Sequence, residues 1–272
     1  MPHGPLVDES SGSEGWAATL VRLAEWARRD GCAVLKLEPD VDAARTDIRA
    51  SLETAGFRPS HEAIQFPNTM CSDISDGPDA VWASLHQKTR YNVRLARKRD
   101  VVTRHGGEAA LDAFYRLYAE TAARDGFAIR ERAYYMDIWS EFLRQGRATV
   151  ILAERDSVPL AGVIPVRFGS TAFYMYGASA TEGRRDMPAY LAQWESLVWS
   201  CAQGCDRYDW WGGPSVQSES DPLWGVARFK SGFGAVLRER VGPWDAGLKP
   251  GAATLYRALT GARRASLAWR TR

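Results

Sequence analysis

The sequence lacks most of the short motifs that mark common enzyme classes. It has no HExxH or HxH metal motif, no GxSxG nucleophile elbow, no Walker loop, and no GxGxxG turn after an expected strand. The four histidines are scattered, and no carboxylate pair stands at a catalytic spacing. These absences argue against metal and dinucleotide chemistry, so we expect no metal site and no bound cofactor.

Cysteine is scarce, and long apolar runs are missing. The chain has 4 cysteines, none of them in a CxxC pair, and Cys201 and Cys205 fall four apart in an apolar helical pattern that favours core packing on one helix face. This usage is typical of a reduced, cytosolic protein. No apolar run approaches the ~20 residues that span a bilayer, and the N-terminus has no signal pattern. We therefore expect a cytoplasmic protein.

Net charge is also small, at +2 over 272 residues, a length that allows one large domain or two small ones. The positive charge is unevenly placed. Residues 81–100 predict one long helix with an apolar face and a basic face, which holds six cations and no acid between Lys88 and Arg99. A solvated surface and a phosphate-facing patch are about equally good interpretations. The basic residues of this face are Lys88, Arg90, Arg94, Arg97, Lys98 and Arg99.

The order of expected elements indicates an α+β protein. Residues 16–66 predict helix, strand, helix and an extended stretch, and the polar residues 68–79 are the best candidate boundary. Helices over 107–127 and 130–146, three strands between 148 and 179, a helix over 189–204 and a strand over 208–213 follow. This order of elements is typical of acetyltransferases: helices come first, then an antiparallel meander, a helix and further strands.

The segment 225–234, GVARFKSGFG, places one lysine between aromatic residues and glycines. Lys230 could present a cation to a developing oxyanion. A surface lysine beside a bulged hairpin is the alternative, and composition alone favours it.

Two arginines precede the helix expected after Pro188. Arg184 and Arg185 could bind an anion together with that helix N-terminus, and Tyr174, Tyr176 and Tyr190 lie close by in sequence. Neither strand-to-helix junction carries the glycine-rich [QR]xxGx[GA] pattern of coenzyme A sites, which argues against an acyl-coenzyme A donor.

Six stretches resemble the FemABX aminoacyltransferases, which use aminoacyl-tRNA to add amino acids to the peptide of a peptidoglycan precursor. They are LHQKTRYNVRLARKRDV, TAARDGF, VPLAGVIPVRFGSTAFYMYGAS, RRDMPAYLAQWESLVW, YDWWGG and GVARFKSGFG, in family order. The resemblance implies two acetyltransferase-like (GNAT-type) domains. Residues 1–78, completed by 241–272, would form the first, incomplete at its N-terminus, and residues 79–240 the second.

The resemblance also implies site residues. Phe229 and Lys230 would lie at the reacting carbonyl, with Lys230 stabilising the oxyanion, and Arg184 would contact the diphosphate of the precursor. The family's N-terminal lysine for that diphosphate has no counterpart that we recognise. The further residues expected at the acceptor are Arg185, Tyr174, Tyr176, Tyr190, Arg90 and Tyr91. Those expected at the tRNA backbone are Lys88, Arg94, Arg97 and Lys98, helped by an arginine tail of Arg257, Arg263, Arg264, Arg270 and Arg272.

The expected partners are aminoacyl-tRNA as co-substrate and a nucleotide-linked or lipid-linked muramyl peptide, the latter reached at the inner face of the membrane. Three alternatives remain open at this stage. They are an acyl-coenzyme A N-acyltransferase, a tRNA-dependent transferase acting on a peptide natural product, and a catalytically incomplete RNA-binding protein.

Overall fold

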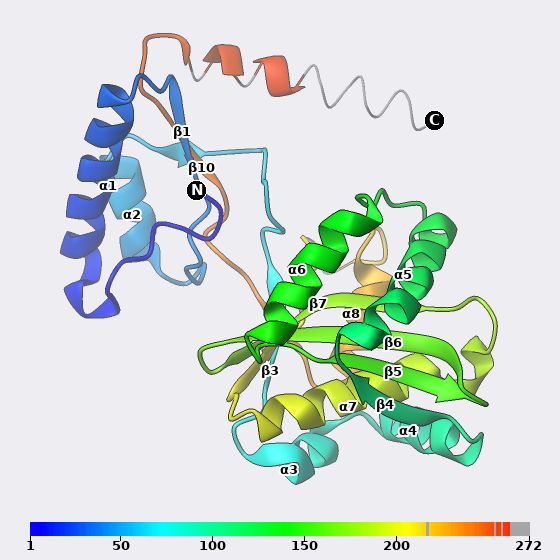
Figure 1. Ribbon diagram of the computed structural model, residues 1–272. Coiled ribbons are helices and arrows are strands. Elements are labelled where there is room, and N and C mark those ends of the chain that lie inside the picture. Colours follow the sequence, from blue (N-terminus) through cyan, green and yellow to red (C-terminus); the bar gives the residue numbers. More distant parts are fainter. Residues whose placement is uncertain (216–217, 253, 257, 262–272) are drawn as a thin grey trace. The chain divides into compact units, whose positions relative to one another are not determined.

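The chain folds into two compact units (Figure 1). The computed structural model describes residues 1–215, 218–252, 254–256 and 258–261. One unit consists of Met1–Thr69 and the chain from Arg238 onward, and the other is Met70–Leu237. The α+β class expected from the sequence is confirmed.

The first unit is a small antiparallel sheet covered by two helices. Its strand order is β1-β10-β2, so a strand from the end of the chain pairs with strands from the beginning. Leu37 of β1 lies opposite Trp244 of β10, and both are fully buried. Trp16 and Leu20, one turn apart on α1, close the same core. The elements are η1 (Glu9–Ser11), α1 (Gly12–Arg29), β1 (Val34–Leu37), α2 (Thr46–Thr54), β2 (Arg58–Pro59) and β10 (Trp244–Gly247).

The second unit is built on a sheet of seven strands in the order β4-β5-β6-β7-β8-β3-β9. The meander β4 to β7 is antiparallel, whereas β7 and β8 run parallel, because helix α7 connects them. The strands are β3 (Thr69–Asp73), β4 (Val102–Gly106), β5 (Val150–Arg155), β6 (Val158–Phe168), β7 (Thr171–Ser179), β8 (Arg207–Asp209) and β9 (Val236–Arg238).

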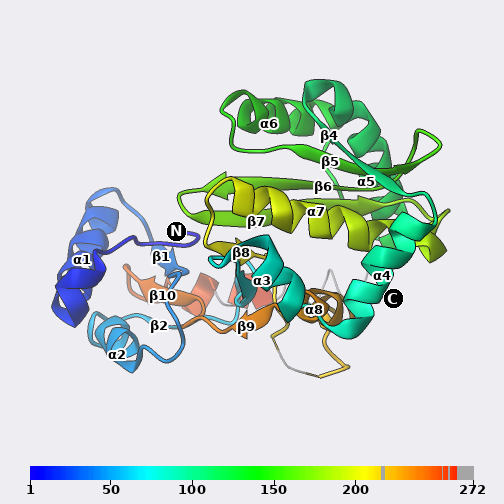
Figure 2. The same cartoon turned by 90° about the horizontal axis from the view of Figure 1, so that it is seen from below.

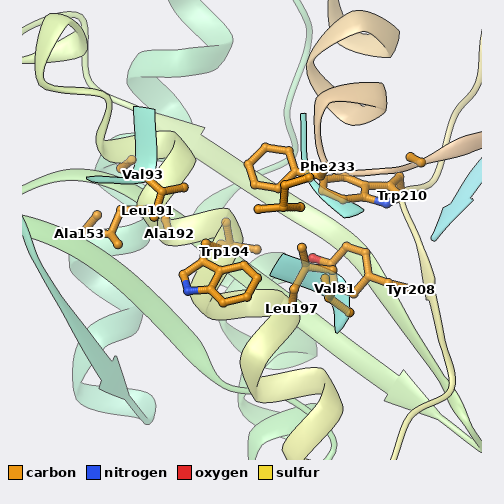
Figure 3. Close-up of a cluster of buried hydrophobic side chains, with 14 of the residues drawn as sticks. Val81, Val93, Ala153, Leu191, Ala192, Trp194, Leu197, Tyr208, Trp210 and Phe233 are labelled. Atoms are coloured by element: carbon orange, nitrogen blue, oxygen red, sulfur yellow. The ribbon is translucent and has the colours of Figure 1, made fainter. Parts of the chain in front are cut away.

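Helices cover both faces of this sheet, which creates two cores (Figure 2). Helices α5 and α6 pack on one face around Phe114 and Trp139. Helix α7 lies on the other face, where Trp194, Tyr208, Trp210 and Phe233 meet (Figure 3). The helices are α3 (Gly77–Ser84), α4 (Gln87–Lys98), η2 (Glu108–Ala110), α5 (Leu111–Asp125), α6 (Arg132–Arg144), η3 (Arg184–Asp186), α7 (Pro188–Ala202) and α8 (Trp224–Gly232).

A bulge in β7 sends two nearby tyrosines to opposite faces of the sheet. Ile164 pairs with Tyr176 and Pro165 with Tyr174, so Met175 is the extra residue. Tyr174 therefore packs in the core under α7, and Tyr176 in the core under α5 and α6. Without the bulge, residues two apart would share a face.

The chain passes from the first unit to the second between Thr69 and Met70, inside the segment 68–79 expected as a boundary, although this segment also contains strand β3. Its polar residues suggest a surface loop, but Ser72 is buried and has hydrogen-bond partners in other elements. The Ser72 hydroxyl is buried, donates to the Phe233 carbonyl at 3.3 Å and accepts from the Trp210 indole at 2.8 Å.

The single helix expected over 81–100 is also wrong, because the chain breaks into α3 and α4. Leu85 and His86 are both extended, with ψ of 144° and 147°. The His86 amide donates to the carbonyl of Gly232 at 2.9 Å. The Arg90 guanidinium donates to the Ala83 and Leu85 carbonyls at the end of α3. These contacts with other elements hold the break.

Three smaller expectations also differ. The segment around Lys230 is helix α8 and not a bulged hairpin, and in YDWWGG only Tyr208 and Asp209 belong to a strand. Cys205 lies beyond the end of α7, so it does not share a helix face with Cys201. The arginines of the expected tail, 257, 263, 264, 270 and 272, lie outside the described residues.

Candidate active site

Helix α8 carries Phe229 and Lys230, the two residues expected at the reacting carbonyl. Local hydrogen bonds define both of its ends. Asp221 lies in the turn before it, where its carboxylate accepts from the Leu223 amide at 2.8 Å and its carbonyl from the Trp224 amide at 2.9 Å. At the other end the Phe233 amide donates to the Lys230 carbonyl at 2.9 Å. Gly234, with a φ of 79°, then turns the chain away. Gly232 allows a close approach to α4, since a Cβ there would lie 2.5 Å from the Thr89 hydroxyl.

Lys230 is buried, at 5% exposure. Its amine donates to the carbonyls of Trp211 and Gly212 at 2.8 and 2.6 Å. Burial lowers the pKa of Lys230 to about 8, and the carboxylate of Asp209 opposes that change. An ammonium has three donors, and the described residues use two of them here.

Phe229 and Tyr190 form a wall between two cavities. Their rings meet edge to face at 5.0 Å, and Phe233 packs behind both at 5.1 and 5.8 Å. Both Phe229 and Tyr190 line a larger cavity of about 520 Å³ and a smaller one of about 270 Å³. In the described chain Lys230 lines neither cavity, although it follows Phe229 directly.

The larger cavity lies between the start of α4 and helix α8, and it combines cations with aromatic rings. Lys88 and Arg228 supply positive charge, and Trp224 adds an indole beside Phe229. The lining residues are Met70, His86, Lys88, Thr89, Tyr190, Pro214, Trp224, Gly225, Ala227, Arg228, Phe229, Ser231, Gly232 and Leu237. Cations that alternate with rings are suited to a nucleotide.

The smaller cavity lies at the start of α7 and includes Arg184. Its lining residues are Ser179, Arg184, Met187, Pro188, Ala189, Tyr190 and Phe229. A guanidinium beside a helix N-terminus favours an anion. The structure therefore places Arg184, Tyr190 and Phe229, predicted separately, around one space.

A buried carboxylate fixes the turn that carries Arg184. Asp186 pairs with Arg99 at the end of α4, 2.7 Å away, and with Arg155 at the end of β5. Arg99 also donates to the Arg185 carbonyl at 3.1 Å. The hydrogen bond from Arg99, and then that from Arg155, hold the pKa of Asp186 below its usual range. Arg185 itself is exposed.

Four other expected acceptor residues lie in different surroundings. Burial raises the pKa of Tyr174 to about 12, and its ring packs on Trp210 at 6.0 Å. Tyr176 lies in the core under α5 and α6, where burial raises its pKa. Arg90 is used at the end of α3, as described above, and Tyr91 is 61% exposed.

The basic face of α4 is partly occupied by internal contacts. Arg94 lies over the Trp82 ring at 5.4 Å, and Arg97 pairs with Glu195 at 3.1 Å. Lys88 and Lys98 are exposed and form no ion pair with a described residue. Of the predicted tRNA residues on α4, Lys88 lines the larger cavity.

Sequence reasoning missed Asp209, Asp186, Trp224 and Arg228. Asp209 could have been predicted from YDWWGG, because a carboxylate next to a buried tyrosine needs a hydrogen-bonding or charged partner. The described residues contain no cluster of His, Cys, Asp and Glu suited to a metal ion. Within that same part of the chain, none of the helices has the length and hydropathy needed to cross a bilayer.

A family model, "Acetyltransferase (GNAT) domain", matches residues 83–231, which lie within the second unit and include every lining residue of the smaller cavity and most of those of the larger one. The chain belongs to the GNAT family. It is accordingly an enzyme of acyl transfer.

Among curated proteins, this GNAT chain is similar to the lipid II:glycine glycyltransferase of Staphylococcus aureus, with 23% identity over 90% of this chain and 76% of the relative. Among solved structures, FemX has the same fold, with a TM-score of 0.84, 23% identity, and coverage of 94% of this chain and 82% of FemX. Another similar structure is the C-terminal domain of a protein described as a putative lysylphosphatidylglycerol synthetase from Agrobacterium fabrum, with a TM-score of 0.56, 12% identity, and coverage of 90% of this chain and 78% of that one. The resemblance to the FemABX proteins is thus confirmed.

Proposed function

We propose that the protein transfers an amino acid from aminoacyl-tRNA to an amine on the stem peptide of a peptidoglycan precursor. The similarity to a glycyltransferase that acts on lipid II, over 90% of this chain, supports this acceptor. No bound cofactor is needed, because aminoacyl-tRNA is the co-substrate. The competing donor is an acyl-coenzyme A.

One observation carries the proposal, the wall of Tyr190 and Phe229 between two unlike cavities. A transferase must bring two substrates to one point. The cavity with Arg184 suits the diphosphate of the precursor, and the cavity with Lys88 and Arg228 suits the 3′ end of the RNA. The reacting groups would meet where the cavities adjoin.

The proposed reaction needs few catalytic groups from the protein. The acceptor amine attacks the ester carbonyl of the aminoacyl-tRNA, a C–N bond forms, and the C–O bond to the terminal ribose breaks. The proton lost by the amine ends on the ribose oxygen that leaves. Because the ester is already activated, positioning and stabilisation of the oxyanion supply most of the acceleration. Lys230 would provide the positive charge through its third N–H.

Reciprocal variants test the assignment of the two cavities. We expect Arg184→Ala to raise KM for the precursor about tenfold or more, with KM for aminoacyl-tRNA unchanged, since a charge-assisted hydrogen bond is lost. Arg228→Ala should raise KM for aminoacyl-tRNA and flatten its salt dependence, with KM for the precursor unchanged. The exposed Arg29 of α1, in the other unit, provides the control Arg29→Ala.

The proposal fails if the two variants affect both substrates alike, or if an acyl-coenzyme A replaces aminoacyl-tRNA as donor in the wild type. Binding of tRNA with a steep salt slope but without transfer would favour the RNA-binding alternative. Transfer to an unrelated peptide but not to the precursor would favour a natural-product acceptor.

A further inference from the structure

The amine of Lys230 is held by main-chain carbonyls of one turn. Trp211 and Gly212 accept from it at 2.8 and 2.6 Å, and both carbonyls belong to the stretch that follows β8. A lysine side chain is flexible, so its amine lies where its acceptors place it. The conformation of this turn therefore decides where the charge of Lys230 is presented.

The turn has a backbone conformation that needs support. Trp211 has a φ of 55°, which is uncommon for a residue with a side chain. Asp209 supplies the support, because its Oδ1 accepts from the Trp211 amide at 2.7 Å. The carboxylate is 5% exposed, and it lies opposite Cys71 of β3, whose thiol is 3.8 Å from Oδ2.

The same carboxylate is the charged neighbour that acts on Lys230. Burial disfavours the ammonium, and Asp209 partly restores it. Two cations lie on neighbouring elements, Arg228 on α8 and Lys88 on α4, and both line the larger cavity. The Cys71 thiol of β3 faces the carboxylate at 3.8 Å, as given above.

We propose that Asp209 is a positioning residue for Lys230, because its carboxylate holds the Trp211–Gly212 turn that binds the lysine amine and supplies the counter-charge for the ammonium. The inference rests on the proposed function only for the role of the Lys230 charge, which is to stabilise the oxyanion. The contacts themselves belong to the fold of the second unit. Asp209 lines neither of the two cavities described above, so we expect its effect to pass through Lys230.

Two substitutions separate the two roles. In Asp209→Asn the side-chain oxygen can still accept from the Trp211 amide, so the turn is kept and the charge is lost. In Asp209→Ala both are lost. Melting temperatures of the two variants show which of them remains folded, and the Asn variant, which keeps the shape, carries the test.

The measurement is the titration of Lys230 by NMR of the full chain with 13C-labelled lysine. The chain has only 5 lysines, so the Lys230 signal can be identified as the one that Lys230→Met removes. We expect the titration midpoint in Asp209→Asn to fall by about one pH unit or more, as for loss of an opposite charge nearby. An unchanged midpoint would overturn the inference, whatever the activity of the enzyme.

Turnover gives the second readout. If the ammonium is needed, the pH above which turnover is lost should fall by the same amount in Asp209→Asn, and turnover near pH 6 should approach that of the wild type. A uniform loss at every pH would mean that Asp209 has a merely structural role. Full turnover by Lys230→Met would instead refute the proposed role of Lys230 and leave the NMR result standing.

Discussion

Replacing Gly232 by alanine tests the close contact that shapes the larger cavity. The added Cβ would lie 2.5 Å from the Thr89 hydroxyl, closer than real Cβ atoms come. Thr89 is 3% exposed, so its side chain has little room to move away. Overpacking of this kind costs about 1–3 kcal/mol. A helical Gly→Ala change gains about 1 kcal/mol.

The expected net result for Gly232→Ala is a loss of about 1 kcal/mol in the free energy of unfolding. The same change made in a Thr89→Ala background should stabilise the protein, because the clash is gone and the helical gain remains. The coupling energy between the two sites should be about 2 kcal/mol. Gly225→Ala is the matched control, since a Cβ there meets nothing within 4 Å.

Urea unfolding followed by tryptophan fluorescence gives these free energies, because the chain has 11 tryptophans. Two results would refute the reasoning. One is that Gly232→Ala stabilises the wild type, and the other is that it destabilises the Thr89→Ala background by the same amount. In either case α4 and α8 would not be in the contact described.

Three further predictions follow from buried charges. Turnover should fall as pH rises through about 8, where Lys230 loses its proton, and a pH–rate profile that stays level to about pH 10 would contradict this. Asp186→Asn should release the turn that carries Arg184, and steady-state assays should then show a several-fold higher KM for the precursor with kcat unchanged. Asp112→Asn is the control, because Asp112 forms an exposed ion pair with Arg132. In the first unit, Asp245→Asn should lower the free energy of unfolding by about 3–5 kcal/mol, because the buried Lys36 ammonium loses the carboxylate that lies 2.7 Å away. The double change Lys36→Met with Asp245→Leu should recover much of this loss, and urea unfolding measures both variants.

Much of the fold could be predicted from the sequence, where local patterns determine the structure. The meander β5 to β7 and helices α5 to α7 have strong hydrophobic periodicity and clear turns, and they lie close to the expected ranges. The break between α3 and α4 could not be predicted, because it depends on a hydrogen bond to Gly232, far along the chain. Strand β3 was missed because its buried serine, Ser72, is satisfied by residues of other elements.

The candidate site shows the same division. Arg184, Tyr190 and Phe229 were expected at the site from their motifs, and they line one cavity. Tyr174 and Tyr176 were both expected at the acceptor site, but a bulge of one residue places them on opposite faces of the sheet. The local sequence contains no pattern that predicts this bulge. The burial of Lys230 was not foreseen, because its acceptors are carbonyls, which every sequence contains.

The proposed reaction can be measured directly. The purified chain would be mixed with tRNA charged with radiolabelled glycine, alanine or serine, and with a nucleotide-linked muramyl pentapeptide or its lipid-linked form, beside a sample treated with ribonuclease. We predict that label moves to the precursor from intact charged tRNA and that Lys230→Met abolishes most of this transfer. Absence of label on both precursors from all three charged tRNAs, with a folded wild-type protein, would contradict the proposed function.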